Sequence, residues 1–93
     1  MIRSFVCKET KALFERQPIR KIPFEIQRPA LRKLKMLDAA TALEDLKAPP
    51  GNRLEKLHGQ REGQYSIRIN GQWRICFKFE DSEARNVEIT DYH

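Results

Sequence analysis

Long apolar segments are absent from this sequence, and cysteine and histidine are scarce. No segment has the roughly 18 consecutive apolar residues of a membrane-spanning helix, and Met1–Cys7 lacks the apolar core of a secretory signal peptide. We therefore expect a cytoplasmic protein that does not associate with membranes. The two cysteines, Cys7 and Cys76, have a spacing that suggests neither a metal site nor a redox pair, so both are expected to be free thiols.

Acidic residues are outnumbered by basic ones. The chain has 18 lysines and arginines against 13 aspartates and glutamates, which gives a net charge of +5 and an isoelectric point near 9.5. Its 93 residues, 40% of them hydrophobic, are enough for one core, so residues 1–93 are expected to form a single soluble domain. The excess of positive charge favours a polyanionic partner or an acidic protein partner.

Apolar and polar residues alternate through the last third of the chain, which predicts three strands buried on one face. A three-residue loop at 70–72, with Gly71 or a neighbour at positive φ, pairs residue 69 with 73, 67 with 75 and 65 with 77. In this register one face carries every large apolar residue of the hairpin: Tyr65, Ile67, Ile69, Trp73, Ile75, Phe77 and Phe79.

The opposite face of the hairpin places Arg68 across from Arg74. Like charges directly opposed on a sheet destabilise it, so an anion is expected beside them. Two readings stay open from the residues alone. A carboxylate such as Glu88, or solvent, balances the pair; alternatively, the two planar guanidinium groups bind a phosphate.

The first half of the chain is predicted to be mainly helical. Ile2–Val6 is expected to form a short strand and Lys8–Arg16 a short helix ended by Pro18. A second helix runs to about Asp38 and begins near residue 24 with a kink, or near 28 with Pro29 in its first turn. Asp38 can cap a further turn or two at 39–46. The predicted fold class is α+β, with the N-terminal strand and three C-terminal strands against two or three helices.

Candidate functional residues lie in the polar loop 52–64, on the arginine face and at the C-terminus: His58, Arg61, Arg68, Arg74, Asp91, Tyr92 and His93. Metal-independent RNA cleavage needs groups that take and give protons, and cations for the charge that develops on phosphorus. Histidine can serve in either proton role, arginine supplies the cation, and an aromatic ring can stack on an unpaired base. The same residues could also simply bind RNA.

Five segments carry a family resemblance: Met1–Phe5, Leu37–Thr41, Arg61–Gly63, Gly71–Phe77 and Asp91–His93. In these segments, spread over essentially the whole chain, the sequence resembles HigB-type toxins of the RelE/ParE superfamily. The resemblance implies a RelE-like α+β domain that cleaves mRNA in the ribosomal A site without a metal or other cofactor. It also implies a HigA-like helix-turn-helix antitoxin as partner, with operator DNA bound only through the antitoxin.

The resemblance assigns roles to individual residues. Arg74 matches the family's phosphate-binding arginine, and Asp91–His93 match its C-terminal catalytic segment. His93 is expected to act as general acid or base, Tyr92 to stack on a base and Asp91 to orient a neighbour, while His58 supports them. Arg68, Arg61 and Lys56 are expected to contact RNA phosphates. The loop departs from the family pattern, because Glu55 occupies the usual histidine position and His58 the usual lysine position.

Two alternatives to a ribosome-dependent endoribonuclease stay open. A gyrase inhibitor of the same superfamily would bind its target without cleaving RNA, although such proteins generally lack the terminal Tyr-His. A weakly catalytic or non-catalytic basic domain would act mainly by binding its antitoxin and, through it, operator DNA.

Overall fold

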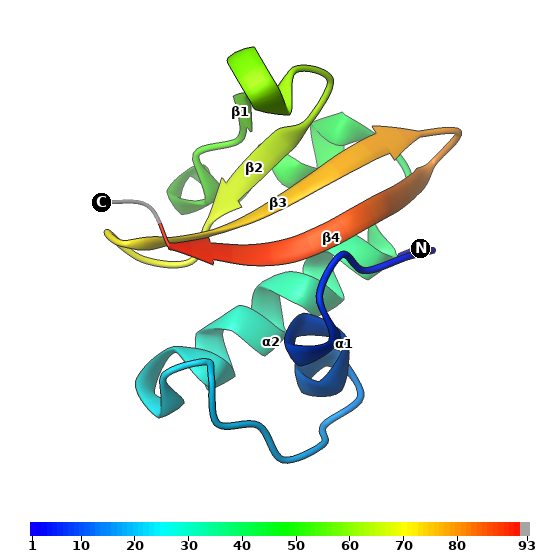
Figure 1. The fold of residues 1–93 in the computed structure, drawn as a ribbon. Coiled ribbons are helices and arrows are strands. Elements are labelled where there is room, and N and C mark those ends of the chain that lie inside the picture. The colour runs from blue at the N-terminus through cyan, green and yellow to red at the C-terminus, as the bar shows by residue number, and fades with distance from the viewer. Residues whose placement is uncertain (92–93) are drawn as a thin grey trace.

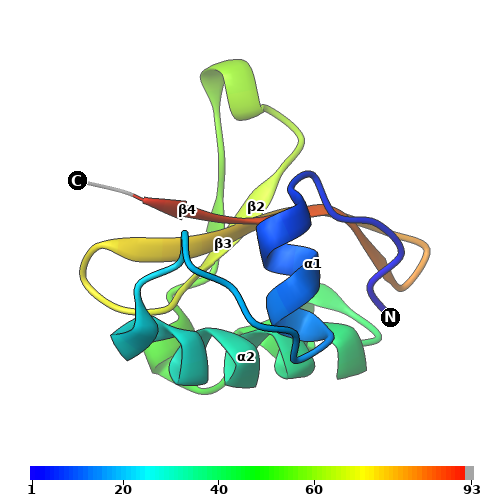
Figure 2. The same ribbon diagram turned by 60° about the horizontal axis from the view of Figure 1, so that its bottom comes forward.

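The computed structural model describes residues 1–91 and shows two helices packed on one face of an antiparallel sheet (Figure 1). The helices are α1 (Lys8–Phe14) and α2 (Phe24–Ala39), and the strands are β1 (Glu55–Lys56), β2 (Tyr65–Arg68), β3 (Trp73–Glu80) and β4 (Glu83–Asp91). The strand order is β1-β2-β3-β4. The helix α2 runs beneath the sheet, and α1 contacts both α2 and β4 (Figure 2). The predicted α+β class is confirmed.

The β2–β3 hairpin has the predicted register. Tyr65 pairs with Phe77 and Ile67 with Ile75, and the loop closes with a 2.8 Å hydrogen bond from the Ile69 N–H to the Trp73 carbonyl. The expectation of a positive φ in the loop is wrong. Instead, the side-chain oxygen of Asn70 accepts hydrogen bonds from the backbone N–H groups of residues 72 and 73, at 2.8 and 2.9 Å, and this side chain bends the backbone.

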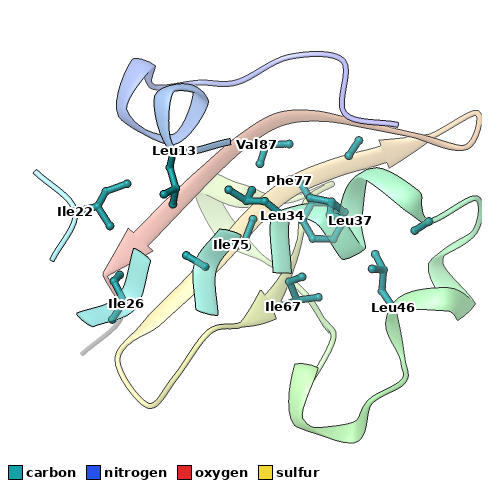
Figure 3. Close-up of a cluster of buried hydrophobic side chains, with 13 residues drawn as sticks. Leu13, Ile22, Ile26, Leu34, Leu37, Leu46, Ile67, Ile75, Phe77 and Val87 are labelled. Atoms are coloured by element: carbon teal, nitrogen blue, oxygen red, sulfur yellow. The ribbon is translucent and has the colours of Figure 1, made fainter. Parts of the chain in front are cut away.

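The apolar face of the hairpin lies on α2, as predicted (Figure 3). Ile67, Ile75 and Phe77 are fully buried, and they pack in one cluster with Leu34 and Leu37 of the helix. Burying each such side chain contributes roughly 1.5–3 kcal/mol, so this layer fixes which face of the sheet is left for function. That remaining face carries Arg68 and Arg74, because side chains alternate along a strand.

The N-terminal segment lies along the free edge of β4 and does not extend the sheet by a full strand. It forms two isolated parallel bridges, Ile2 with Ala84 and Phe5 with Val87. Farther along the same edge, the Thr10 hydroxyl accepts a 3.1 Å hydrogen bond from the Ile89 N–H. The fourth strand of the sheet is therefore β1, on the opposite edge, and the predicted strand at Ile2–Val6 is reduced to these bridges.

The helix boundaries decide between two expectations for α2. It begins at Phe24, the earlier of the two predicted starts, and keeps Pro29 inside it. A short 3₁₀ turn follows at Leu43–Leu46, and two others lie at Pro50–Asn52 and Gly59–Arg61. No helix within residues 1–91 has the length and apolar character needed to cross a bilayer.

The turn after α2 is capped by a different aspartate from the one expected. The Asp45 carboxylate accepts hydrogen bonds from the backbone N–H groups of Thr41 and Ala42, at 2.9 and 3.2 Å. Asp38 instead accepts a 2.8 Å hydrogen bond from the Ile2 N–H. The expected cap role for Asp38 is therefore wrong, and its side chain ties the N-terminal segment to α2.

Candidate functional site

Arg68 and Arg74 lie directly opposite each other on β2 and β3, on the sheet face that α2 does not cover. Their pairing was the central expectation from the alternation of the sequence. Both lie among the residues that line a shallow pocket of about 340 Å³ at the loop end of the hairpin: Arg53, Glu55, Arg68, Asn70, Gly71 and Arg74. Three guanidinium groups and one carboxylate therefore surround one small volume.

Arg74 is buried, with 8% of the residue exposed, and most of its donors are used inside the protein. Its Nε donates a 2.7 Å hydrogen bond to the Ser66 hydroxyl. Its Nη2 donates to the Arg53 carbonyl at 2.5 Å and to the Ser66 carbonyl at 3.4 Å. Within residues 1–91, Nη1 is the nitrogen left for an outside anion, since its nearest carboxylate oxygen, on Glu55, is 3.9 Å away.

Arg68 is more accessible than Arg74. Its Nε donates a 3.0 Å hydrogen bond to the Asn70 carbonyl, which ties the base of the guanidinium group to the turn. In the part of the chain that the structure describes, both terminal nitrogens of Arg68 are without a hydrogen-bonded partner. A planar group held in this way presents two parallel N–H donors, the arrangement that binds a phosphate in a bidentate manner.

Glu55 is the carboxylate beside the two arginines, whereas the sequence suggested Glu88. Pairing of Glu55 with Ser66 places its side chain on the arginine face. Glu88 instead forms a 2.7 Å ion pair with Arg61. One feature of the sequence pointed to Glu55, since this residue occupies the usual histidine position of the family that the chain resembles.

Three of the residues expected in the loop lie outside the pocket lining. Lys56 pairs with Tyr65 and so shares the side of the sheet that faces the helices. His58 is exposed and precedes the turn at Gly59–Arg61. Arg61 also donates to Gln64 at 3.1 Å besides its ion pair with Glu88, so it links the loop to β4. The structure therefore brings together Arg68 and Arg74, with Arg53 and Glu55, but not Lys56, His58 or Arg61.

The C-terminal candidates are described only in part. Asp91 ends β4, pairs with Trp73 and accepts a 3.2 Å hydrogen bond from the Gln72 side chain. The preceding residue, Thr90, pairs with Arg74, so the end of β4 comes within one residue of the arginine pair. Tyr92 and His93 lie outside the described residues.

The charge in the pocket comes from side chains. Within residues 1–91 no group of three histidine, cysteine, aspartate or glutamate residues is placed to hold a metal ion. Within residues 1–91 neither cysteine forms a disulfide bond, and neither lines the pocket. The arrangement can bind an oxyanion such as a phosphodiester through guanidinium groups, and Glu55 adds a group that can accept a proton.

The chain matches a family model along nearly its whole length. The model describes the RelE-like toxin of type II toxin–antitoxin system HigB, and it matches residues 3–93. The chain is 49% identical over 70 residues to Toxin HigB-1 of Vibrio cholerae, which covers 75% of this chain and 74% of the relative. It is 34% identical to Endoribonuclease HigB of Proteus vulgaris, with full coverage of both chains.

Solved structures support the same fold. A chain of the YoeB-YefM toxin–antitoxin complex from Staphylococcus aureus superposes with a TM-score of 0.61 at 17% identity, covering 100% of this chain and 98% of that one. A second structure of the complex from the same organism gives a TM-score of 0.57, also at 17% identity. The family match, supported by the two relatives and the confirmed fold, shows that this chain belongs to the HigB-like family of RelE-like toxins of type II toxin–antitoxin systems.

Proposed function

We propose that this single-domain toxin is a ribosome-dependent endoribonuclease that cleaves mRNA in the A site without a metal ion. The observation that carries the proposal is the Arg68–Arg74 pair in an open pocket on the sheet face opposite α2. Two opposed guanidinium groups repel each other, and the carboxylate beside them, on Glu55, is 3.9 Å from Arg74 Nη1, so the pair favours a further anion. A relative of full coverage is named as an endoribonuclease, which supports a phosphodiester as that anion.

The arginines stabilise the charge that develops when a 2′-hydroxyl attacks phosphorus. Arg68 offers two terminal nitrogens, and Arg74 offers Nη1 from a guanidinium group that Ser66 and the Arg53 carbonyl hold in place. Because Arg74 is already oriented by these bonds, little reorganisation is needed as the transition state forms. The burial of Arg74 also lowers the local dielectric, which strengthens its attraction to the anion.

Proton transfer is assigned to His93, His58 and Glu55. His93 is the general acid or base, Tyr92 stacks on an unpaired base, Asp91 orients a neighbour, and His58 supports the site from the loop; these roles follow the family resemblance. Glu55 lines the pocket and is a second candidate for accepting the 2′-hydroxyl proton. Arg61 and Lys56 act as outlying RNA contacts.

The proposed partner is a HigA-like helix-turn-helix antitoxin, which connects the toxin to operator DNA. Membership in a toxin–antitoxin family supports an antitoxin, and the two Staphylococcus aureus neighbours were solved as toxin–antitoxin complexes. The net charge of +5 suits both an acidic antitoxin segment and ribosomal RNA. We place the toxin in the cytoplasm, where the ribosome and mRNA are.

The test is to add purified toxin to translating ribosomes and map the 5′ ends of the mRNA. Wild type should produce new ends within the codon in the A site. Arg68→Ala should reduce the cleavage rate roughly 100-fold, since it removes a charge-assisted contact to the phosphate. Arg32→Ala, an equal charge loss at an exposed position of α2, should leave cleavage unchanged.

Two outcomes would contradict the proposal. Intact message at a large excess of wild-type toxin would favour the non-catalytic reading, in which the domain acts by binding its antitoxin. Cleavage by Arg68→Ala at the wild-type rate would remove the arginine pair from the mechanism.

A further inference from the structure

The site described so far has fewer free donors than its arginine count suggests. Of the Arg74 nitrogens, Nε and Nη2 are hydrogen-bonded to Ser66 and to the Arg53 carbonyl. One nitrogen cannot form the two parallel bonds by which a guanidinium group grips a phosphate. Among the partners that residues 1–91 provide, Arg74 therefore holds the site together and has one terminal nitrogen left for a ligand, whereas Arg68 keeps both of its terminal nitrogens.

Arg53 supplies a further guanidinium group to the same pocket. Its side chain is exposed, and within residues 1–91 it forms no hydrogen bond or ion pair. All five of its N–H donors are thus available to a ligand. Its main-chain carbonyl accepts the hydrogen bond from Arg74 Nη2, so its backbone lies next to the buried arginine while no residue in 1–91 occupies its guanidinium group.

The backbone at Arg53 is in the left-handed conformation, with φ 44° and ψ 57°. This conformation is unfavourable for any residue that has a Cβ atom, and glycine adopts it without penalty. Gly51 lies two residues earlier but does not take this conformation. A strained non-glycine residue that persists beside a pocket is a reason to look for a role of its side chain.

The neighbouring residue fixes Arg53 in place. Asn52 is fully buried, and its side-chain amide donates a 3.1 Å hydrogen bond to the Leu46 carbonyl and accepts one from Lys33. Its backbone N–H bonds to the Pro49 carbonyl at 2.9 Å. Arg53 is therefore anchored by a core side chain on one side and by Arg74 on the other, which limits where its guanidinium group can reach.

We propose that Arg53 is a binding residue for the sugar–phosphate backbone of the RNA and provides the second complete guanidinium fork of the pocket. Arg53 and Arg68 then bind the RNA strand. Arg74 holds Ser66 and the Arg53 backbone in place and contacts the scissile phosphate through Nη1. The identity of the ligand as RNA rests on the proposed function. The presence of an anion-binding fork at Arg53 rests on its own geometry.

The test measures binding of an RNA trimer whose first two sugars are 2′-deoxy, so that neither phosphodiester has an attacking 2′-hydroxyl, over a range of NaCl concentrations. Arg53→Gly should weaken binding roughly tenfold and make the slope of log K against log salt less steep by about 0.7, the value for one phosphate contact on a single strand. Glycine suits the left-handed backbone, so the carbonyl that holds Arg74 is preserved. Arg53→Lys should keep the wild-type slope.

Controls separate this inference from a structural effect and from the proposed function. Arg32→Ala removes one charge from the other side of the sheet and should not change the slope. The urea midpoint of Arg53→Gly should equal or exceed that of wild type. Wild-type affinity and slope in Arg53→Gly, or no binding of the trimer by wild type, would overturn the role of Arg53. If wild type fails to cleave mRNA on ribosomes while the Arg53 effects on trimer binding persist, the phosphate site stands and the nuclease proposal fails.

Discussion

Replacing Arg74 should unfold the protein more readily than any other change in the arginine pocket. Arg74→Ala removes the donors that satisfy the Ser66 hydroxyl and the Arg53 carbonyl, and Ser66 is fully buried. Hydrogen bonds to a charged group are worth about 1.5–3 kcal/mol each, and a buried group left without a partner adds to the loss. The two strong bonds together predict a loss of at least about 3 kcal/mol in the free energy of unfolding, and a loss of 3 kcal/mol lowers Tm by roughly 12–24 °C in a domain of this size.

Trp73 makes this change measurable by fluorescence during urea denaturation. It is the single tryptophan of the chain and begins β3, one residue before Arg74. Arg68→Ala is the matched control, because Arg68 carries the same charge on the facing strand but its side chain forms one exposed hydrogen bond within residues 1–91. It should cost less than about 1 kcal/mol. A loss below 1 kcal/mol for Arg74→Ala, or equal losses for the two variants, would refute the assignment of Arg74 as the residue that holds the pocket together.

Three other predictions test separate parts of the structure. Backbone hydrogen bonds from Thr41, and then from Ala42, lower the pKa of the Asp45 carboxyl group. The stability that the ionised carboxylate adds is therefore present above the ordinary carboxyl pKa and is lost as the pH falls through the lowered pKa. The difference in Tm between wild type and Asp45→Ala should shrink in acid. Thr10→Val leaves the Ile89 N–H without its acceptor and should cost about 1–2 kcal/mol in urea unfolding, whereas Thr10→Ser should retain most of the stability. Glu55→Gln should tighten trimer binding, because it removes the negative charge of a carboxylate near Arg74. It should also slow mRNA cleavage roughly 100-fold if Glu55 accepts the proton. Unchanged trimer affinity would show that Glu55 does not face the ligand.

The register of the hairpin was predictable because a strand has a side-chain period of two. A slip of one residue would have exposed Ile67 and Ile75 and buried their charged neighbours, so the apolar pattern permits one pairing. The opposition of Arg68 and Arg74 follows from that pairing without any knowledge of the fold. The sheet face that carries the arginine pair could therefore be predicted from the alternation of apolar and polar residues alone.

Other parts of the site depend on contacts between distant segments. The strand β1 has two residues, too few to show any periodicity, so nothing local places Glu55 beside the arginines. The left-handed backbone falls on Arg53 and not on nearby Gly51, because the buried Asn52 determines the path of the chain. The turn at 70–72 was expected to need a positive φ, but the Asn70 side chain provides the bend. In each case a specific tertiary or side-chain contact overrides the local preference.

Closure of the β4 edge by the N-terminal segment has a consequence for synthesis of the protein. The Ala84 N–H bonds to the Met1 carbonyl and the Ile89 N–H to Thr10, so the first and last parts of the fold complete each other. A nascent chain stalled before β4 lacks the strand on which its own beginning must dock, and Arg74 lacks its neighbour Thr90. The N-terminal segment therefore cannot reach its docked position before β4 has been synthesised.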